Sequence, residues 1–149
     1  MTAPPPLENI HATAIILGER GLLITGDSGS GKTTLARALI AHWQATGRFA
    51  RLVSDDQVFL TAHSGRLIAR APATIAGLVE VHGLGIVSTD HQPAAVIDMI
   101  VQLRDAGQAA RMPEPQMRRI LGIDVPLNEL PARNIAASLS AVAAFADAK

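Results

Sequence analysis

Short apolar segments separated by turn residues run along most of the chain, and the first two predict a β-hairpin. Residues 10–17 are apolar and β-prone, and residues 22–25 are apolar again. The residues between them, Gly18-Glu19-Arg20-Gly21, are typical of a tight turn. Residues 1–9, which include three consecutive prolines, are expected to be a flexible lead-in to a single domain over residues 10–149.

A helix is predicted after this hairpin, over residues 32–45. Leu35 and Leu39 lie at helical spacing, either His42 or Trp43 continues their face, and Gly47 is a stop signal. The later segments predict strands at 51–54, 57–63, 66–70 and 94–103, and a closing helix at 134–148. Residues 72–81 are ambiguous and can begin as a short helix. Residues 109–130 are expected to be irregular, with a β-prone piece at 120–125.

The composition narrows the class of protein. Hydrophobic residues make up 48% of the 149 residues but aromatic residues only 3%, so aliphatic side chains must fill the core. Basic and acidic residues number 13 each, and this neutral balance argues against non-specific nucleic-acid binding, which depends on excess positive charge. Cysteine is absent, which excludes disulfides. No apolar run is long enough to span a membrane and no signal peptide is visible, so we expect a soluble cytoplasmic protein.

The strongest motif is a phosphate-binding loop of the form G-x-x-x-x-G-K-[ST], set between the second predicted strand and the helix. With the residue that follows it, it comprises Gly26, Asp27, Ser28, Gly29, Ser30, Gly31, Lys32, Thr33 and Thr34. The glycines allow backbone N–H groups to face a phosphate, Lys32 brings a positive charge to the outer phosphates, and the Thr33 hydroxyl can ligate Mg²⁺. We therefore expect the chain to bind a nucleoside triphosphate.

Acidic residues and a histidine supply further candidates for chemistry. Asp55 and Asp56 end a predicted strand soon after the loop, where one carboxylate can hold the metal and the other can take a proton from an attacking hydroxyl. The alternative is a solvated turn. Glu80 is either a surface residue of a strand or a metal ligand beside the glycines that follow it. His11, taken alone, is more often structural or merely exposed than catalytic.

Four arginines in the last third of the chain could meet the charge of a transferred phosphoryl group. They are Arg111, Arg118, Arg119 and Arg133. The sequence alone does not show which of these arginines has this role.

Several segments, in their order along the chain, resemble those of the catalytic domain of the HPr kinase/phosphorylases. These are bacterial enzymes that act on a serine of the phosphocarrier protein HPr. The matching segments are residues 10–12, 23–33, 51–56, 80–86 and 130–134. The phosphate loop is shared by many families, whereas Val-Glu-Val-His-Gly-Leu-Gly-Ile at residues 79–86 is much more specific. The chain looks like the short, alphaproteobacterial form that consists of the catalytic domain alone.

The resemblance implies a P-loop kinase domain with a mixed β-sheet flanked by helices, similar to phosphoenolpyruvate carboxykinase. It implies ATP and Mg²⁺ as cofactors, and HPr or a nitrogen-branch relative of HPr as the protein substrate in a regulatory phosphotransferase system. It also implies a reverse reaction in which phosphate attacks phosphoserine and pyrophosphate is released. Members often form hexamers, so a homo-oligomer is expected. No nucleic acid or membrane partner is implied.

The resemblance also implies roles for individual residues. His11 matches the catalytic histidine, Lys32 the lysine on the β- and γ-phosphates, and Thr33 a ligand of Mg²⁺. Asp56 matches the carboxylate that acts as base in transfer and as acid in the reverse reaction. The remaining matches are Asp55 near the metal, Glu80 as a Mg²⁺ ligand, Arg111 as the catalytic arginine, and Arg133 with Asn134 in the segment linked to dephosphorylation.

The sequence departs from the family pattern at sites that bear on activity. His82 stands where the family usually has an arginine, and the segment around Arg133 is shorter, which bears on phosphorolysis. Two other functions therefore remain in view. One is a small-molecule P-loop kinase, although no arginine-rich lid is evident. The other is a nucleotide-binding regulatory module with weakened catalysis. Because His11, Lys32, Asp55, Asp56 and Glu80 are all present, we predict an active kinase.

Overall fold

A curved mixed sheet forms the body of the molecule in the computed structural model, which describes residues 6–105 and 116–147. Its strands follow the order β1 (Leu7–Ile10), β5 (Val58–His63), β6 (Arg66–Arg70), β9 (Ala94–Arg104), β3 (Arg20–Gly26), β2 (Thr13–Leu17) and β4 (Ala50–Ser54). The hairpin of β10 (Gln116–Ile120) and β11 (Ile123–Pro131) joins it through β9, and β7 (Leu78–Val81) with β8 (Gly85–Ser88) forms a separate hairpin. The mixed α/β fold predicted from the sequence is confirmed.

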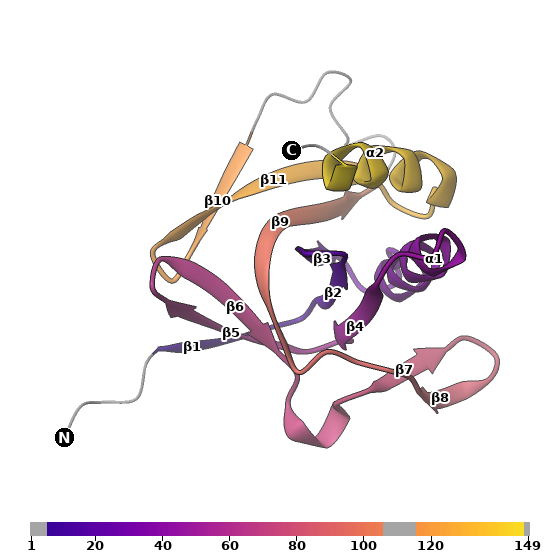
Figure 1. The fold of residues 1–149 in the computed structure, drawn as a ribbon, viewed down its shortest axis with the longest axis horizontal. Coiled ribbons are helices and arrows are strands. Elements are labelled where there is room, and N and C mark those ends of the chain that lie inside the picture. Colours follow the sequence, from indigo (N-terminus) through magenta and orange to yellow (C-terminus); the bar gives the residue numbers. More distant parts are fainter. Residues whose placement is uncertain (1–5, 106–115, 148–149) are drawn as a thin grey trace.

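Strand β9 runs through the middle of the molecule and changes partners along its length (Figure 1). Its first residues pair antiparallel with β6, and its later residues pair parallel with β3 on one side and β11 on the other. The register shifts where β3 begins, at Gly21. A Cβ at Gly21 would lie 1.9 Å from the carbonyl oxygen of Val96, so only glycine allows the strands to approach this closely.

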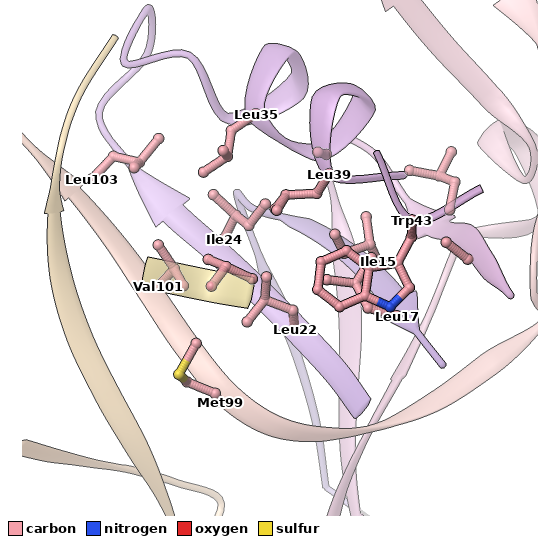
Figure 2. Close-up of a cluster of buried hydrophobic side chains, with 14 of the residues drawn as sticks. Ile15, Leu17, Leu22, Ile24, Leu35, Leu39, Trp43, Met99, Val101 and Leu103 are labelled. Atoms are coloured by element: carbon pink, nitrogen blue, oxygen red, sulfur yellow. The ribbon is translucent and has the colours of Figure 1, made fainter. Parts of the chain in front are cut away.

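Helices α1 (Lys32–Ala45) and α2 (Ile135–Asp147) cover one face of the sheet (Figure 1). The core beneath them is mostly aliphatic, as the composition predicts, and Figure 2 shows Leu35 and Leu39 of α1 above Ile24 and Val101. Trp43 is the residue that continues this face, because its indole is 2% exposed whereas His42 is exposed. No helix in the described part of the chain is long and apolar enough to cross a membrane.

The single strand predicted over residues 10–17 is wrong, and the difference matters for the site. The chain breaks at His11 and Ala12, because β1 pairs with β5 while β2 pairs with β3 and β4. The predicted lead-in also differs from the structure, since residues 7–9 belong to β1; residues 1–5 lie outside the described part.

Other boundaries differ where turn residues were not recognised. The stretch predicted as irregular contains the β10–β11 hairpin, and the β-prone piece at 120–125 spans its turn, with positive φ at Leu121 (51°) and Gly122 (79°). The ambiguous piece begins with the 3₁₀ turn Ala73–Ile75 and ends in β7. The predicted closing helix is confirmed as α2.

Candidate active site

The phosphate loop lies between the end of β3 and the start of α1, as predicted. Lys32 is only 8% exposed, and its Nζ donates hydrogen bonds to the carbonyl oxygens of Gly26 at 3.0 Å and Asp27 at 3.1 Å. Gly31, at φ 96°, precedes the helix and provides no side-chain cap. The first N–H groups of α1 are therefore available to an anion, and the ammonium of Lys32 is held over the same loop.

Gly26 allows the loop to close tightly. A Cβ at this position would lie 2.6 Å from Ser30 Oγ and 3.1 Å from the Cβ of Leu103. Any larger residue would displace the buried end of the loop. This fold therefore requires glycine at the first position of the motif for steric reasons.

Asp55 connects three elements beneath the loop. Its side chain is buried (6% exposed), and its Oδ1 accepts hydrogen bonds from Thr33 Oγ1 of α1 at 2.8 Å and from Thr13 Oγ1 of β2 at 2.9 Å. Thr13 was not recognised from the sequence, because a threonine in an apolar strand carries no motif signal. The two hydroxyls fix the orientation of a carboxylate that would otherwise be buried without partners.

Asp56 points away from Asp55 because of its backbone. It has φ 69°, and the N–H of Gln57 donates to the carbonyl oxygen of Asp55 at 2.8 Å across it. This is a three-residue γ-turn in a conformation that non-glycine residues seldom adopt. The side chain of Asp56 is 69% exposed, in contrast to its buried neighbour. The two adjacent carboxylates therefore point in different directions.

His11 meets Asp56 at the break between β1 and β2. The His11 Nε2 atom lies 2.6 Å from Asp56 Oδ1. The backbone holds the pair together as well, since the N–H of Ala12 donates to the carbonyl oxygen of Asp56 at 3.3 Å. The structure thus brings together two residues that are 45 positions apart in the sequence.

A hollow of about 450 Å³, called here the nucleotide hollow, gathers most of the predicted site residues. His11, Lys32, Thr33, Asp55 and Asp56 all line it. Glu80 and His82, from the β7–β8 hairpin, line it as well, and both are exposed. Apolar side chains of Ile75, Leu78 and Ile86 form another part of its wall. The arrangement offers a phosphate cradle, hard oxygen ligands and a carboxylate–imidazole pair in one cavity.

Oxygen ligands in this hollow fit Mg²⁺. Thr33 and Asp55 lie within hydrogen-bond distance of each other, and hydroxyl and carboxylate oxygens are the ligands that this ion takes. Among the described residues, no group of three or more His, Asp or Glu side chains could hold a metal. This donor set is that of an ion which keeps several waters and takes oxygens from substrate phosphates.

Arg133 lies against the outside of the phosphate loop. Its Nη1 donates to the carbonyl oxygen of Gly29 at 3.2 Å, its backbone N–H donates to that of Ser30 at 3.3 Å, and its Nη2 lies 2.9 Å from Asp105 Oδ1. The neighbouring Asn134 caps α2, since its Oδ1 accepts from the N–H of Ala137 at 3.2 Å. Arg133 is thus placed at the site, whereas Asn134 has a structural contact.

The remaining candidate arginines differ in their surroundings. Arg119 pairs with Asp124 across the β10–β11 hairpin at 2.9 Å, and this hydrogen bond lowers the pKa of the Asp124 carboxyl. Arg118 lies beside the loop, where it lines a second hollow together with Gly26 and Asp27. Arg111 lies outside the described residues.

Comparison with known proteins identifies the family. Residues 5–148 match the family model of the HPr Serine kinase C-terminal domain. The chain belongs to this family. The resemblance noted in the sequence is confirmed over nearly the whole chain.

Curated relatives named HPr kinase/phosphorylase share this family. Those of Clostridium tetani (strain Massachusetts / E88) and Clostridium perfringens (strain SM101 / Type A) are each 31% identical over 93% of this chain and 48% of their own length. The chain therefore spans about half the length of these relatives. The solved structure of the Hpr(Ser) kinase/phosphatase from Coxiella burnetii is similar at a TM-score of 0.80 and 25% identity, covering 93% of this chain and 96% of that chain.

Proposed function

We propose that this chain is an ATP-dependent serine protein kinase that phosphorylates HPr, or a nitrogen-branch relative of HPr, and so regulates a phosphotransferase system. The observation that carries the proposal is the His11–Asp56 pair at 2.6 Å, which lines the same hollow as Lys32 of the phosphate loop. A base beside a phosphate cradle is what transfer to a hydroxyl requires. The names of the relatives supply the class of acceptor.

In this mechanism Asp56 accepts the proton of the acceptor serine as the serine oxygen forms its bond to the γ-phosphorus and the bond to the β-phosphate oxygen breaks. His11 Nε2 orients the carboxylate and stabilises its charge. Lys32 and the N–H groups at the start of α1 hold the phosphates in place. The exposed position of Asp56 allows a serine on another protein to reach it.

We propose Thr33, Asp55 and Glu80 as the residues that hold Mg²⁺, directly or through water. The ion would neutralise charge that builds up on the phosphate oxygens during transfer. Thr13 keeps the Asp55 carboxylate in the required orientation through its 2.9 Å hydrogen bond. Arg111 is proposed as the arginine that meets the transferred group.

The reverse reaction is part of the proposal. Asp56 would return the proton to the serine oxygen as inorganic phosphate attacks phosphoserine, so that the serine–phosphorus bond breaks and pyrophosphate forms. Arg133 and Asn134 are proposed to contribute to this direction. A homo-oligomer is proposed by analogy with the family.

The test is mass spectrometry of HPr after incubation with the protein, ATP and Mg²⁺, followed by excess phosphate and an assay for pyrophosphate. We expect one phosphoryl group on serine, its removal by phosphate, and neither reaction with the Asp56→Asn variant. Phosphorylation without reversal would restrict the protein to a kinase. No phosphoserine with ATP still bound would contradict the proposal and favour a regulatory module or another acceptor.

A further inference from the structure

A second hollow, of about 310 Å³, adjoins the nucleotide hollow, and His11 lines both. We call it the flanking hollow. Polar and charged groups from distant segments meet in it: Gly26 and Asp27 of the phosphate loop, Gln102 and Arg104 at the end of β9, and Arg118 of β10. Neither the sequence motifs nor the mechanism above assigns it a role.

The flanking hollow lies next to the point at which a phosphoryl group would be transferred. The carbonyl oxygens of Gly26 and Asp27, both lining residues, accept the hydrogen bonds from Lys32 Nζ. Since this ammonium binds the outer phosphates in a phosphate loop, the flanking hollow opens at the outer end of the bound nucleotide. The flanking hollow is also lined by His11, which contacts Asp56. A segment of an acceptor protein that presents a serine to Asp56 would pass this hollow.

The distribution of charge in the flanking hollow favours an anion. Arg118 is half-buried, and within residues 6–105 and 116–147 no hydrogen bond or ion pair engages its guanidinium. Arg104 lies near it, with its Nε 3.0 Å from Glu129 Oε1. Asp27 is the acidic lining residue, and it is exposed. A partly desolvated guanidinium that has no partner among the described residues can bind a carboxylate or a phosphate through two hydrogen bonds.

The adjacent residue shows that this placement is specific to Arg118. Successive side chains of a strand point to opposite faces, so Arg119 lies on the other side of β10. Its guanidinium makes hydrogen bonds to both oxygens of Asp124, at 2.9 and 3.3 Å. The two neighbouring arginines thus differ in that one has its anion within the chain and the other faces a cavity.

We propose that the flanking hollow binds an oxyanion of the acceptor protein, with Arg118 as its principal ligand and a determinant of acceptor specificity. The group bound is either a carboxylate close to the target serine or the phosphoryl group of the phosphoserine product. This proposal rests on the proposed kinase function and names a recognition site beyond the phosphate loop and the His11–Asp56 pair.

The test compares Arg118→Gln with Arg119→Gln in steady-state kinetics with HPr, ATP and Mg²⁺. We expect Arg118→Gln to raise the KM for HPr about tenfold, the effect of losing one charge-assisted pair, while kcat and the KM for ATP stay within about twofold. Arg119→Gln should leave all of these values within about twofold. Equal effects of the two substitutions on the KM for HPr and on the KM for phosphoserine-HPr, or an effect of Arg118→Gln on ATP alone, would overturn the proposal.

The source of the oxyanion follows from the reverse reaction. If Arg118→Gln raises the KM for phosphoserine-HPr far more than the KM for HPr, the ligand is the phosphoryl group. If it raises both equally, the ligand is a carboxylate of the acceptor. Both results support the flanking hollow as a recognition site.

A separate measurement keeps the proposal testable if the wild-type protein does not phosphorylate HPr. O-phosphoserine is titrated into isotope-labelled protein whose phosphate loop is filled with a non-hydrolysable ATP analogue. We expect amide shifts at Gln102 and Arg118 in the wild type and in Arg119→Gln, and their loss in Arg118→Gln. Absent HPr phosphorylation with these shifts present would refute the proposed function alone. Absent shifts, together with no phosphorylation, would refute the flanking hollow as well.

Discussion

The hydrogen bond from Thr13 to Asp55 allows a direct test of how the metal-side carboxylate is held. In Thr13→Val the side chain keeps its shape, but the buried Asp55 Oδ1 loses the donor at 2.9 Å and retains the hydrogen bond from Thr33. A hydrogen bond to a charged group contributes about 1.5–3 kcal/mol, so we expect the free energy of unfolding to fall by about 2 kcal/mol. For a domain of this size that lowers Tm by about 4–8 °C.

Thr25→Val is the matched control for this substitution. Thr25 is also buried and on a neighbouring strand, but its Oγ1 donates to the neutral carbonyl oxygen of Val101 at a long 3.5 Å. We expect its loss to stay below about 1 kcal/mol. Urea and thermal denaturation without nucleotide measure both variants, since bound ligand would mask the difference. Equal destabilisation by the two substitutions would refute the reasoning that charge on Asp55 makes its hydrogen bond the stronger one.

Other predictions concern the loop and the catalytic pair. Asp56→Asn should keep ATP binding, measured by calorimetry, and lose transfer to HPr; normal transfer would remove Asp56 as the base. Lys32→Ala should weaken both together, and intact binding would show that the ammonium does not reach the phosphates. Asp56→Gly should be more stable than Asp56→Ala by about 1 kcal/mol, because only alanine places a Cβ at φ 69°; urea denaturation decides, and equal stability would argue against strain there. Arg133→Ala should raise the Kd for ATP a few-fold through its contact with Gly29, with stability changed by less than about 1 kcal/mol. An unchanged Kd would show that Arg133 does not steady the loop.

The parts of the site that the sequence predicted are those set by local chemistry. The phosphate loop needs glycines, a lysine and a threonine at fixed spacing, and these fold locally between a strand and a helix, so the motif predicts them well. Asp55 and Asp56, which end a strand soon after the loop, are likewise recognised from a local pattern. By contrast, Thr13 reaches Asp55 only because β2 and β4 are neighbours in the sheet, and no local pattern records that pairing. Asp105, which pairs with Arg133, was missed for the same reason.

The error in the first strand shows what the sheet itself contributes to the site. An apolar run reads as one strand, yet the chain changes partners at His11 and Ala12, from β5 to β3 and β4. The other half of the pair lies at a second irregularity, the positive-φ turn at Asp56 between β4 and β5. The hydrogen bond from Ala12 to the carbonyl oxygen of Asp56 joins the two irregularities. The strand pairing is thus interrupted at two adjoining places, and each interruption exposes one member of the His11–Asp56 pair. Because β5 pairs with β1 after the turn and β4 pairs with β2 before it, a change in either pairing would move His11 and Asp56 together.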